Sequence, residues 1–277
     1  PGNERIRAFD FQRRRVRTFL KQGFENESMA TEVEIRSEEE GPFPPILDHG
    51  IDYRWFEEPI LEGFDLTRCP PWFPKRDLAR RALGLLDDWS APTAKTVELE
   101  AYVADLVGRL GEGIGEIERR YNFGHVDFLC RIVDLLGNWS RAAEECTVSR
   151  THGDLQPGNI RIDPSGEHVW LLDWEHAGRR VSHYDRFVYG LETRAASGFA
   201  DRLEAFMRGE GEGWVFGAAT EDDDSRRALL AIFLLEDLDW FLSKSLSGPI
   251  TRVSRGLELY VDELKKLGPG LARLDGE

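Results

Sequence analysis

The sequence predicts an α+β protein in two parts: a small N-terminal part with an antiparallel sheet and one helix, and a larger, mostly helical C-terminal part. Before residue 63, short runs alternate between apolar and polar residues, as strands do, on either side of one charged, proline-free stretch. After Gly63, apolar residues recur at helical spacing through most of the chain. We therefore expect one domain at residues 1–62 and a second at residues 63–277.

The N-terminal part reads as strand, strand, helix, strand, strand. Pro42, Pro44 and Pro45 interrupt the chain after the helix, because proline lacks the backbone N–H that a continuing helix needs. The expected elements are strands at residues 5–11 and 15–20, a helix at 27–40, and extended segments at 46–47 and 53–56.

The C-terminal part contains seven stretches of helical periodicity and one hairpin. Asp163-Pro164-Ser165-Gly166 predicts the turn of that hairpin, between strands at 159–162 and 168–172. Glycine-rich runs at 111–115 and 209–213 contain carboxylates, which would repel phosphates, so we expect them to be loops that end helices. The expected helices are at 77–89, 96–110, 123–136, 184–193, 199–207, 225–243 and 253–267.

Composition excludes several classes of function. The formal net charge of -15 would repel a phosphate backbone, so we expect no nucleic-acid partner. The longest apolar run, at 228–235, is far shorter than the roughly 20 residues of a membrane helix, and no apolar leader stands at the N-terminus. We expect a cytoplasmic protein with no membrane span, and no protein-partner surface stands out.

The chemistry is concentrated in the sequence HGDLQPGN at residues 152–159 and in Asp173. Asp154 supplies a carboxylate and Asn159 an amide oxygen from one loop, and the hairpin returns Asp173 beside them. Oxygen donors of this kind suit Mg²⁺, and phosphoryl transfer needs a carboxylate near the acceptor hydroxyl as well as metal ligands. We interpret Asp154 as the group that faces the acceptor, and Asn159 and Asp173 as metal ligands.

HGDLQPGN together with LLDWE resembles the catalytic and metal-binding motifs of aminoglycoside phosphotransferases and choline kinases. The resemblance implies a two-lobed, protein-kinase-like fold whose N-terminal lobe binds the nucleotide. It also implies Mg²⁺ as cofactor and ATP as co-substrate, with GTP possible. In such proteins an aspartate at the place of Asp185 holds the catalytic loop by hydrogen bonds, and His152 is a structural residue.

The same resemblance implies residues that hold the phosphates. Lys21 is the only lysine before residue 75, and it is the expected clamp on the α- and β-phosphates. Glu32 is the expected helix partner of Lys21, with Glu34 nearly as good a choice. Gly2 and Asn3 would be the remnant of the loop over the phosphates, since the first strand is short or missing.

The resemblance also implies a hinge for the adenine at residues 56–63. There the carbonyl group of Pro59 and, two residues on, the N–H group of Leu61 would contact the base, with Ile60 between them. Proline is compatible with this role because the interaction does not use its missing N–H donor.

The acceptor is the least determined part of the prediction. Glu236, Asp237, Asp239 and Trp240 cluster on one expected helix, where they could hold an amine or form a polar helix face with a core tryptophan. We expect an ATP- and magnesium-dependent phosphotransferase that acts on a hydroxyl of an aminoglycoside, an amino alcohol or a sugar-like molecule. The alternative is a catalytically silent kinase-fold protein that binds nucleotide or regulates a partner.

Overall fold

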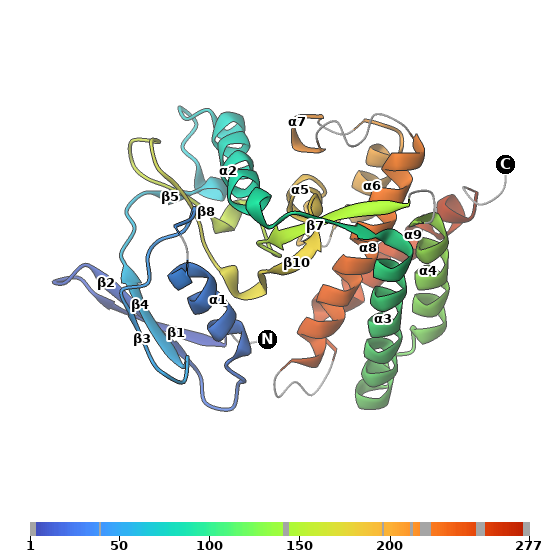
Figure 1. Ribbon diagram of the computed structural model, residues 1–277, viewed down its shortest axis with the longest axis horizontal. Helices are drawn as coiled ribbons and strands as arrows, with labels where there is room; N and C mark the ends of the chain where they lie inside the picture. Colours follow the sequence, from blue (N-terminus) through green and yellow to red (C-terminus); the bar gives the residue numbers. More distant parts are fainter. Residues whose placement is uncertain are drawn as a thin grey trace. The chain divides into compact units, whose positions relative to one another are not determined.

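The computed structural model describes residues 4–38, 40–140, 144–195, 197–210, 213–216, 223–247 and 253–273. The chain divides into two compact units, one formed by residues 1–94 and 149–189 and the other by residues 95–148 and 190–277 (Figure 1). The first unit therefore includes residues on both sides of Gly63. The division into functional domains at Gly63 stays a prediction. Small antiparallel sheets and many helices confirm the predicted α+β class.

The N-terminal sheet of the first unit has the strand order β1-β2-β4-β3, with antiparallel pairing throughout. Arg5 lies opposite Leu20 in the β1–β2 pair, so both side chains lie on one face of the sheet. On that face Leu20 packs with Met29 and Val33 of α1 and with Phe56 of β4. The elements are β1 Arg5–Asp10, β2 Arg15–Leu20, α1 Glu27–Glu38, β3 Asp48–His49 and β4 Trp55–Pro59.

The rest of the first unit surrounds the predicted hairpin, which is confirmed as β8 and β9 with Ile160 opposite Leu171. The backbone N–H of Leu171 donates to the carbonyl of Pro42 at 2.6 Å, which ties the hairpin to the segment after α1. The elements are β5 Phe64–Asp65, η1 Leu66–Arg68, α2 Lys75–Ser90, η2 Ala91–Thr93, the end of β7 (Glu145–Thr151), η4 Pro157–Asn159, β8 Ile160–Ile162, β9 Val169–Leu171, η5 Trp174–His176, β10 Gly178–Val181 and most of α5 Tyr184–Gly190.

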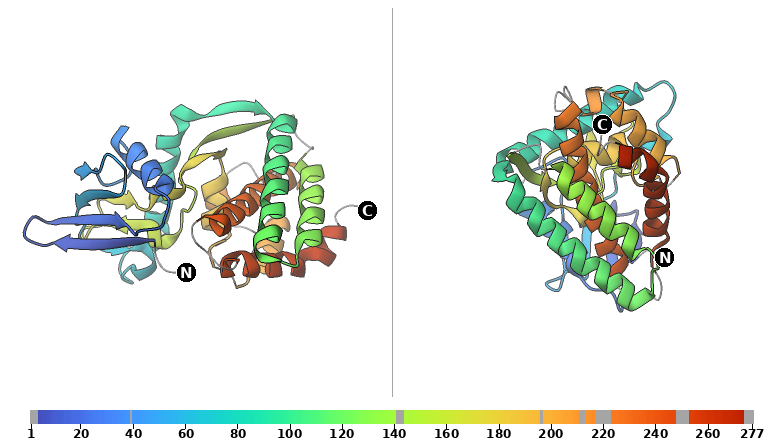
Figure 2. Two further views of the ribbon diagram at one scale, coloured as in Figure 1. Left: turned by 90° about the horizontal axis from the view of Figure 1, so that it is seen from below. Right: turned by 90° about the vertical axis from the view of Figure 1, so that its right-hand side faces the viewer.

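The second unit is mostly helical. Helices α3 and α4 run side by side and both pack against α8, while α9 packs against α6 and α8 (Figure 2). The short strand β6 pairs with the beginning of β7, with Lys95 opposite Val148. The elements are β6 Lys95–Glu98, α3 Leu99–Tyr121, α4 Val126–Trp139, α6 Phe199–Met207, α7 Gly213–Phe216, α8 Asp223–Leu246 and α9 Arg255–Arg273.

The prediction that residues 111–115 end a helix is wrong, because α3 continues through them to Tyr121. Leu110, Ile114 and Ile117 keep the helical spacing and are at most 3% exposed. Each glycine inside a helix costs about 1 kcal/mol relative to alanine, and burial of these apolar side chains outweighs that cost.

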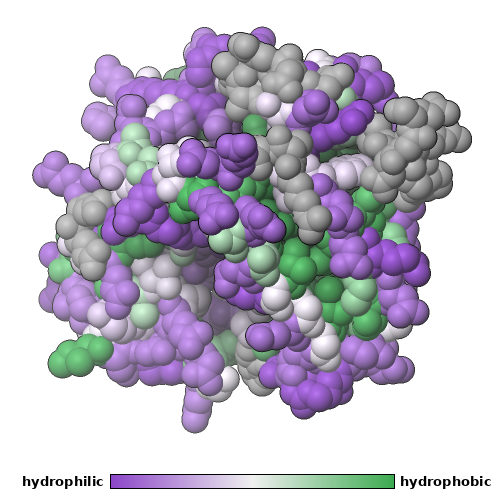
Figure 3. Space-filling view, turned by 45° about the vertical axis from the view of Figure 1, so that its right-hand side comes forward, coloured by the Kyte–Doolittle hydropathy of each residue, from purple (hydrophilic) through white to green (hydrophobic). Residues whose placement is uncertain are grey.

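No helix in the described part of the chain is both long enough and apolar enough to cross a membrane. Figure 3 shows one face of the molecule, on which hydrophilic side chains predominate and hydrophobic ones lie in smaller areas between them. This surface agrees with the high content of charged residues, 31% of the sequence.

Candidate functional site

The second residue after β7 is a glycine that no other residue could replace without rearrangement. Gly153 has φ 85°, in the left-handed region that side chains disfavour. A Cβ atom at this position would lie 2.0 Å from the carbonyl oxygen of His176. The backbone of the loop therefore approaches the segment after Asp173 as closely as a backbone can.

Asp185 of α5 holds this loop. Its carboxylate, in a residue 3% exposed, accepts hydrogen bonds from the backbone N–H of His152 at 2.7 Å and of Gly153 at 2.9 Å. Burial raises the pKa of Asp185, and these two backbone hydrogen bonds and the positive charge of Arg180 oppose that shift. The arrangement is the one that the sequence predicts for Asp185.

His152 links the loop to the end of the hairpin. Its Nε2 donates to the carbonyl of Leu172 at 2.8 Å, and its Nδ1 accepts from the backbone N–H of Asp154 at 3.2 Å. The two contacts hold the ring from both of its nitrogens. It is fully buried beside Trp174, with ring centroids 4.6 Å apart, which suits the structural role predicted for it.

Asp154 and Asn159 face each other across the loop. Asn159 Nδ2 donates to the backbone carbonyl of Asp154 at 2.9 Å and lies 3.4 Å from its Oδ2. Gln156 Nε2 donates to the same carboxylate oxygen at 3.2 Å. The carboxylate of Asp154 is therefore oriented by two amide groups from its own loop.

Asp173 lies next to this loop because the backbone N–H of Leu172 donates to the carbonyl of Asn159 at 2.8 Å. Asp173 has φ 68° and ψ 58°, a left-handed conformation that is uncommon for a residue with a side chain and is enriched at functional sites. Burial raises the pKa of Asp173 to about 7, and the carboxylates of Glu175, Glu32 and Asp154 add to the shift, while Arg5 opposes it.

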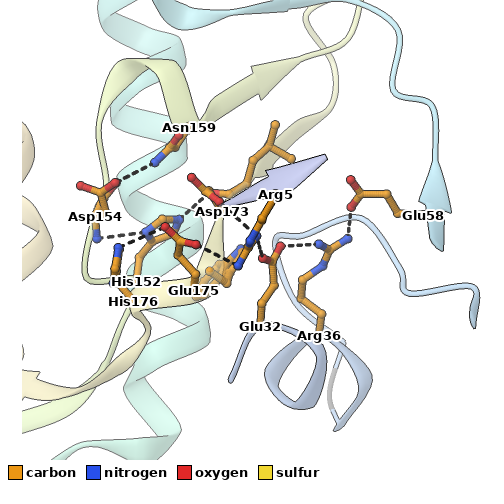
Figure 4. Close-up of polar contacts among 12 residues, drawn as sticks. Arg5, Glu32, Arg36, Glu58, His152, Asp154, Asn159, Asp173, Glu175 and His176 are labelled. Carbon is orange, nitrogen blue, oxygen red and sulfur yellow. Dashed lines mark hydrogen bonds and ion pairs between the residues drawn. The ribbon is translucent and has the colours of Figure 1, made fainter. Parts of the chain in front are cut away.

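A buried arginine that the motifs do not indicate lies beside Asp173 (Figure 4). Arg5 Nη1 is 2.6 Å from Glu32 Oε2 and 3.5 Å from Asp173 Oδ1, and Nη2 is 2.9 Å from Glu175 Oε2. Burial acts to lower the pKa of Arg5, but these carboxylates raise it overall, so the side chain stays a cation. The sequence gives one weak signal for this role of Arg5. Arg5 is a charged residue that lies opposite Leu20 of β2, on the face of the sheet that is buried.

The structure pairs Glu32 with arginines. Arg5 and Arg36 both bind its carboxylate, which is 2% exposed, whereas Glu34 is exposed. Lys21 directly follows Leu20, the last residue of β2. Its backbone N–H donates to the carbonyl of Glu4 at 2.8 Å. The role of Lys21 at the phosphates stays a prediction.

The hinge residues lie at the end of β4. The N–H of Ile60 donates to the carbonyl of Arg14, and the carbonyl of Leu61 accepts from Arg161, each at 2.9 Å. Neither is a group that the predicted adenine contacts use, since those are the carbonyl of Pro59 and the N–H of Leu61. The two other nucleotide residues predicted, Gly2 and Asn3, lie outside the residues that the structure describes.

The predicted acceptor residues lie on α8, in the second unit, and bind other side chains there. Glu236, 3% exposed, accepts a hydrogen bond from the hydroxyl of Tyr102, and Asp239 lies 3.6 Å from Arg109. The guanidinium carbon of Arg194 stands 3.6 Å from the ring centroid of Trp240. Asp237 is fully buried and accepts from the same arginine at 2.7 Å. A cation–π contact to Trp240 is thus made within the protein itself.

The site has the donors that magnesium prefers and lacks those of a closed metal cage. Within the described residues, no group of three or more histidine, cysteine, aspartate and glutamate side chains is arranged to hold a metal. Magnesium is commonly held by only one or two carboxylates together with water and substrate phosphates. Asp173 and Asn159, with the excess of carboxylates around them, fit that kind of site.

The chain was compared with known protein families, curated sequences and solved structures, and only the solved structures gave matches. No protein-family model matches the chain, and no curated protein matches it in sequence. Solved structures similar to it include an ethanolamine kinase from Plasmodium vivax (TM-score 0.59, 14% identity, 96% of this chain and 80% of that chain) and choline kinase LicA from Streptococcus pneumoniae (0.59, 14%, 98% and 90%). A third is aminoglycoside phosphotransferase APH(4)-Ia (0.59, 13%, 100% and 92%). At these identities the likeness is one of fold, and it confirms the predicted protein-kinase-like fold class.

Two glycines of the loop give a matched pair of variants. Gly153→Ala should destabilise the protein by roughly 2 kcal/mol or more, since it combines a positive φ with a clash against a backbone carbonyl. Gly158→Ala should change stability by less than about 1 kcal/mol, because its Cβ would meet nothing within 4 Å. Urea unfolding of both variants checks the expectation, and equal losses would contradict it.

Asp185→Asn tests the tie to the loop. The amide can accept from only one of the two backbone N–H groups and sets its own N–H₂ against the other, so we expect a loss of about 2 kcal/mol in unfolding free energy. The control is Asp262→Asn on α9, an exposed carboxylate that lies 3.4 Å from Nζ of Lys265 at the surface. That variant should lose less than about 1 kcal/mol. A loss in Asp185→Asn no larger than in the control would show that the tie is dispensable.

Proposed function

We propose that the chain is an ATP- and magnesium-dependent phosphotransferase that moves the γ-phosphoryl group to a hydroxyl of a small molecule such as an aminoglycoside, an amino alcohol or a sugar. One observation carries the proposal: Asp154 and Asn159 of one ordered loop lie beside Asp173, with Asp185 fastening the loop. The fold is shared with structures named as ethanolamine kinase, choline kinase and aminoglycoside phosphotransferase, which supports the same class of reaction.

In this proposal Asp154 orients the acceptor hydroxyl and takes its proton. The amide groups of Gln156 and Asn159 hold its carboxylate in one orientation, so that the hydroxyl finds a fixed acceptor. As the oxygen of the acceptor bonds to the γ-phosphorus, the bond from that phosphorus to the bridging oxygen breaks and ADP leaves. The proton passes to Asp154 and then to solvent.

Asp173 and Asn159 would hold the metal, which when bound neutralises charge on the phosphates of the nucleotide. The donation from Asn159 Nδ2 to Asp154 turns the amide so that its oxygen is the atom available to a cation. The left-handed backbone of Asp173 directs its carboxylate from the end of the hairpin strand into the same region.

The nucleotide would be held at two places in the first unit. The carbonyl of Pro59 and the N–H of Leu61 are proposed for the adenine, and Lys21 for the α- and β-phosphates. Glu32, buried and ionised between two arginines, would act on the phosphate region through these cations, and the pKa of its carboxyl is lowered although burial acts to raise it.

A transfer screen identifies the acceptor. The protein is incubated with Mg²⁺ and γ-labelled ATP or GTP, and with separate panels of aminoglycosides, amino alcohols and sugars, and labelled products are resolved by chromatography. Label on one panel confirms the reaction and names the acceptor class. Nucleotide binding without label on any panel would instead favour the catalytically silent alternative.

Asp154→Asn should lower the rate of phosphoryl transfer by roughly 10²-fold or more, since the amide cannot take the proton. The affinity for ATP should stay within about twofold, because Asp154 faces the acceptor in this mechanism. Steady-state kinetics and equilibrium nucleotide binding measure the two quantities. Unchanged turnover in this variant would remove Asp154 from the mechanism, and Asp262→Asn on α9 serves as the control for a remote carboxylate.

The stabilisation of the protein by Mg²⁺ should increase as the pH rises through about 7, the pKa of Asp173, because a carboxylate ligand must lose its proton to bind a metal. The raised pKa means that the metal-free fold binds this proton more tightly than the unfolded chain. Its contribution to stability is therefore full below pH 4 and is lost as the pH rises through 7.

Melting temperatures from pH 5.5 to 8.5, with and without Mg²⁺, test this pH dependence. The difference between them should grow across that range in the native protein and stay flat in Asp173→Asn. A magnesium effect independent of pH in the native protein would show that Asp173 is not the titrating ligand.

A further inference from the structure

The guanidinium group of Arg5 joins three acidic side chains that come from two distant parts of the chain. Glu32 belongs to α1, while Asp173 and Glu175 lie at and just after the end of the hairpin. The side chain of Arg5 is 5% exposed, and that of Glu32 is 3% exposed. An ion pair buried to this degree keeps its charges only where the geometry is favourable, and removal of one partner leaves the other without compensation.

The same contacts distinguish Arg5 from its neighbour Arg36. Arg36 is also buried and binds the other oxygen of Glu32, at 2.7 Å. Its remaining polar contacts go to the carboxylate of Glu58, in β4, and to the carbonyl of Pro44, in the segment between α1 and β3. Of the two arginines that hold Glu32, only Arg5 reaches the residues of the proposed metal site (Figure 4).

The planar fork of an arginine is required for such a bridge. Nη1 contacts Glu32 and Asp173, and Nη2 contacts Glu175, so two nitrogens in fixed relation serve three carboxylates. A lysine offers a single point charge on a flexible stem and cannot hold the same three groups in one geometry. Arg5 therefore lies within ion-pair distance of both Glu32 on α1 and Asp173, and it compensates part of the charge of Asp173.

We propose that Arg5 is a positioning residue that fixes the Asp173–Glu175 turn against α1 and so orders Asp173 for a divalent cation. The metal part of this inference rests on the proposed function, and the coupling of the turn to α1 rests on the contacts of Arg5 alone. Partners that orient a metal ligand commonly change metal affinity by 10- to 100-fold when they are lost.

The experiment compares Arg5→Met with Arg36→Met. Both substitutions remove a buried cation from Glu32, so both should destabilise the fold, and they differ in contact with Asp173 and Glu175. Binding of Mn²⁺, used in place of Mg²⁺, is measured by electron paramagnetic resonance with and without ADP, at a temperature where both variants are folded. Hydrogen exchange of peptides covering residues 170–180 reports the turn without any metal.

We expect Arg5→Met to weaken Mn²⁺ binding by about tenfold or more and to speed exchange at residues 173–177. In Arg36→Met both quantities should stay close to those of the native protein. Arg5→Lys keeps the charge, so its unfolding free energy should be close to that of the native protein. Its affinity for Mn²⁺ should stay low: on a logarithmic scale of dissociation constants, it should lie closer to Arg5→Met than to the native protein.

Three results would overturn the inference. If the two methionine variants behave alike while the native protein transfers phosphate, Arg5 is merely structural and the proposed function stands. If Arg5→Lys restores native binding in full, charge alone is sufficient and positioning is not needed. If the native protein binds no Mn²⁺ in either condition, the inference falls together with the metal ligands proposed, and the transfer screen decides separately on the enzyme.

Discussion

The geometry of the catalytic loop depends on one buried carboxylate. The carboxylate of Asp185 accepts hydrogen bonds from the backbone N–H groups of His152 and Gly153, two consecutive donors of the loop. That bond fixes the direction in which the chain leaves Gly153, and the direction sets where Asp154 points. Everything else in the site is attached to this loop: Asn159 by its bonds to Asp154, and the end of the hairpin by the bond from His152 to Leu172. The loop that carries Asp154 and Asn159 is thus held in place by a residue that touches none of the reacting atoms.

Around Asp173 the acidic side chains outnumber the basic ones. Asp154, Asp173, Glu175 and Glu32 lie close enough that three of them raise the pKa of Asp173, and Arg5 is the cation that opposes the shift. Carboxylates held together in a site of low dielectric either bind protons or recruit a cation. Near pH 7, the pKa of Asp173, a proton and a divalent cation would compete for this carboxylate in the proposed metal site.

The arrangement of the proposed catalytic residues could be predicted because their relationships are local. Asp154 and Asn159 share one loop, a short hairpin returns Asp173 to it, and Asp185 follows within the same stretch of chain. Arg5 could not be predicted in this way, since its partners at Glu32, Asp173 and Glu175 are brought to it by the packing of α1 on the sheet and of η5 on α1. A motif records the spacing along the chain, whereas the partner of a buried charge is chosen by the tertiary fold. The extension of α3 through residues 111–115 has a similar cause, because burial of Ile114 and Ile117 overrides the local preference of glycine.

The loop and helix α1 are therefore tied to the proposed metal site in different ways. The tie through Asp185 and His152 consists of hydrogen bonds to backbone atoms, so it fixes the path of the chain whatever the state of the carboxylates. The tie through Arg5 consists of ion pairs to the carboxylates themselves, so it depends on their charge and on the place of α1. If α1 moved by a few ångströms, the hydrogen bonds of the loop would stay in place. Arg5 is paired with Glu32 of α1, so the same movement would draw this cation away from Asp173. In a site built this way, α5 preorganises the backbone of the loop, while the position of α1 sets the charge at Asp173, the proposed metal ligand.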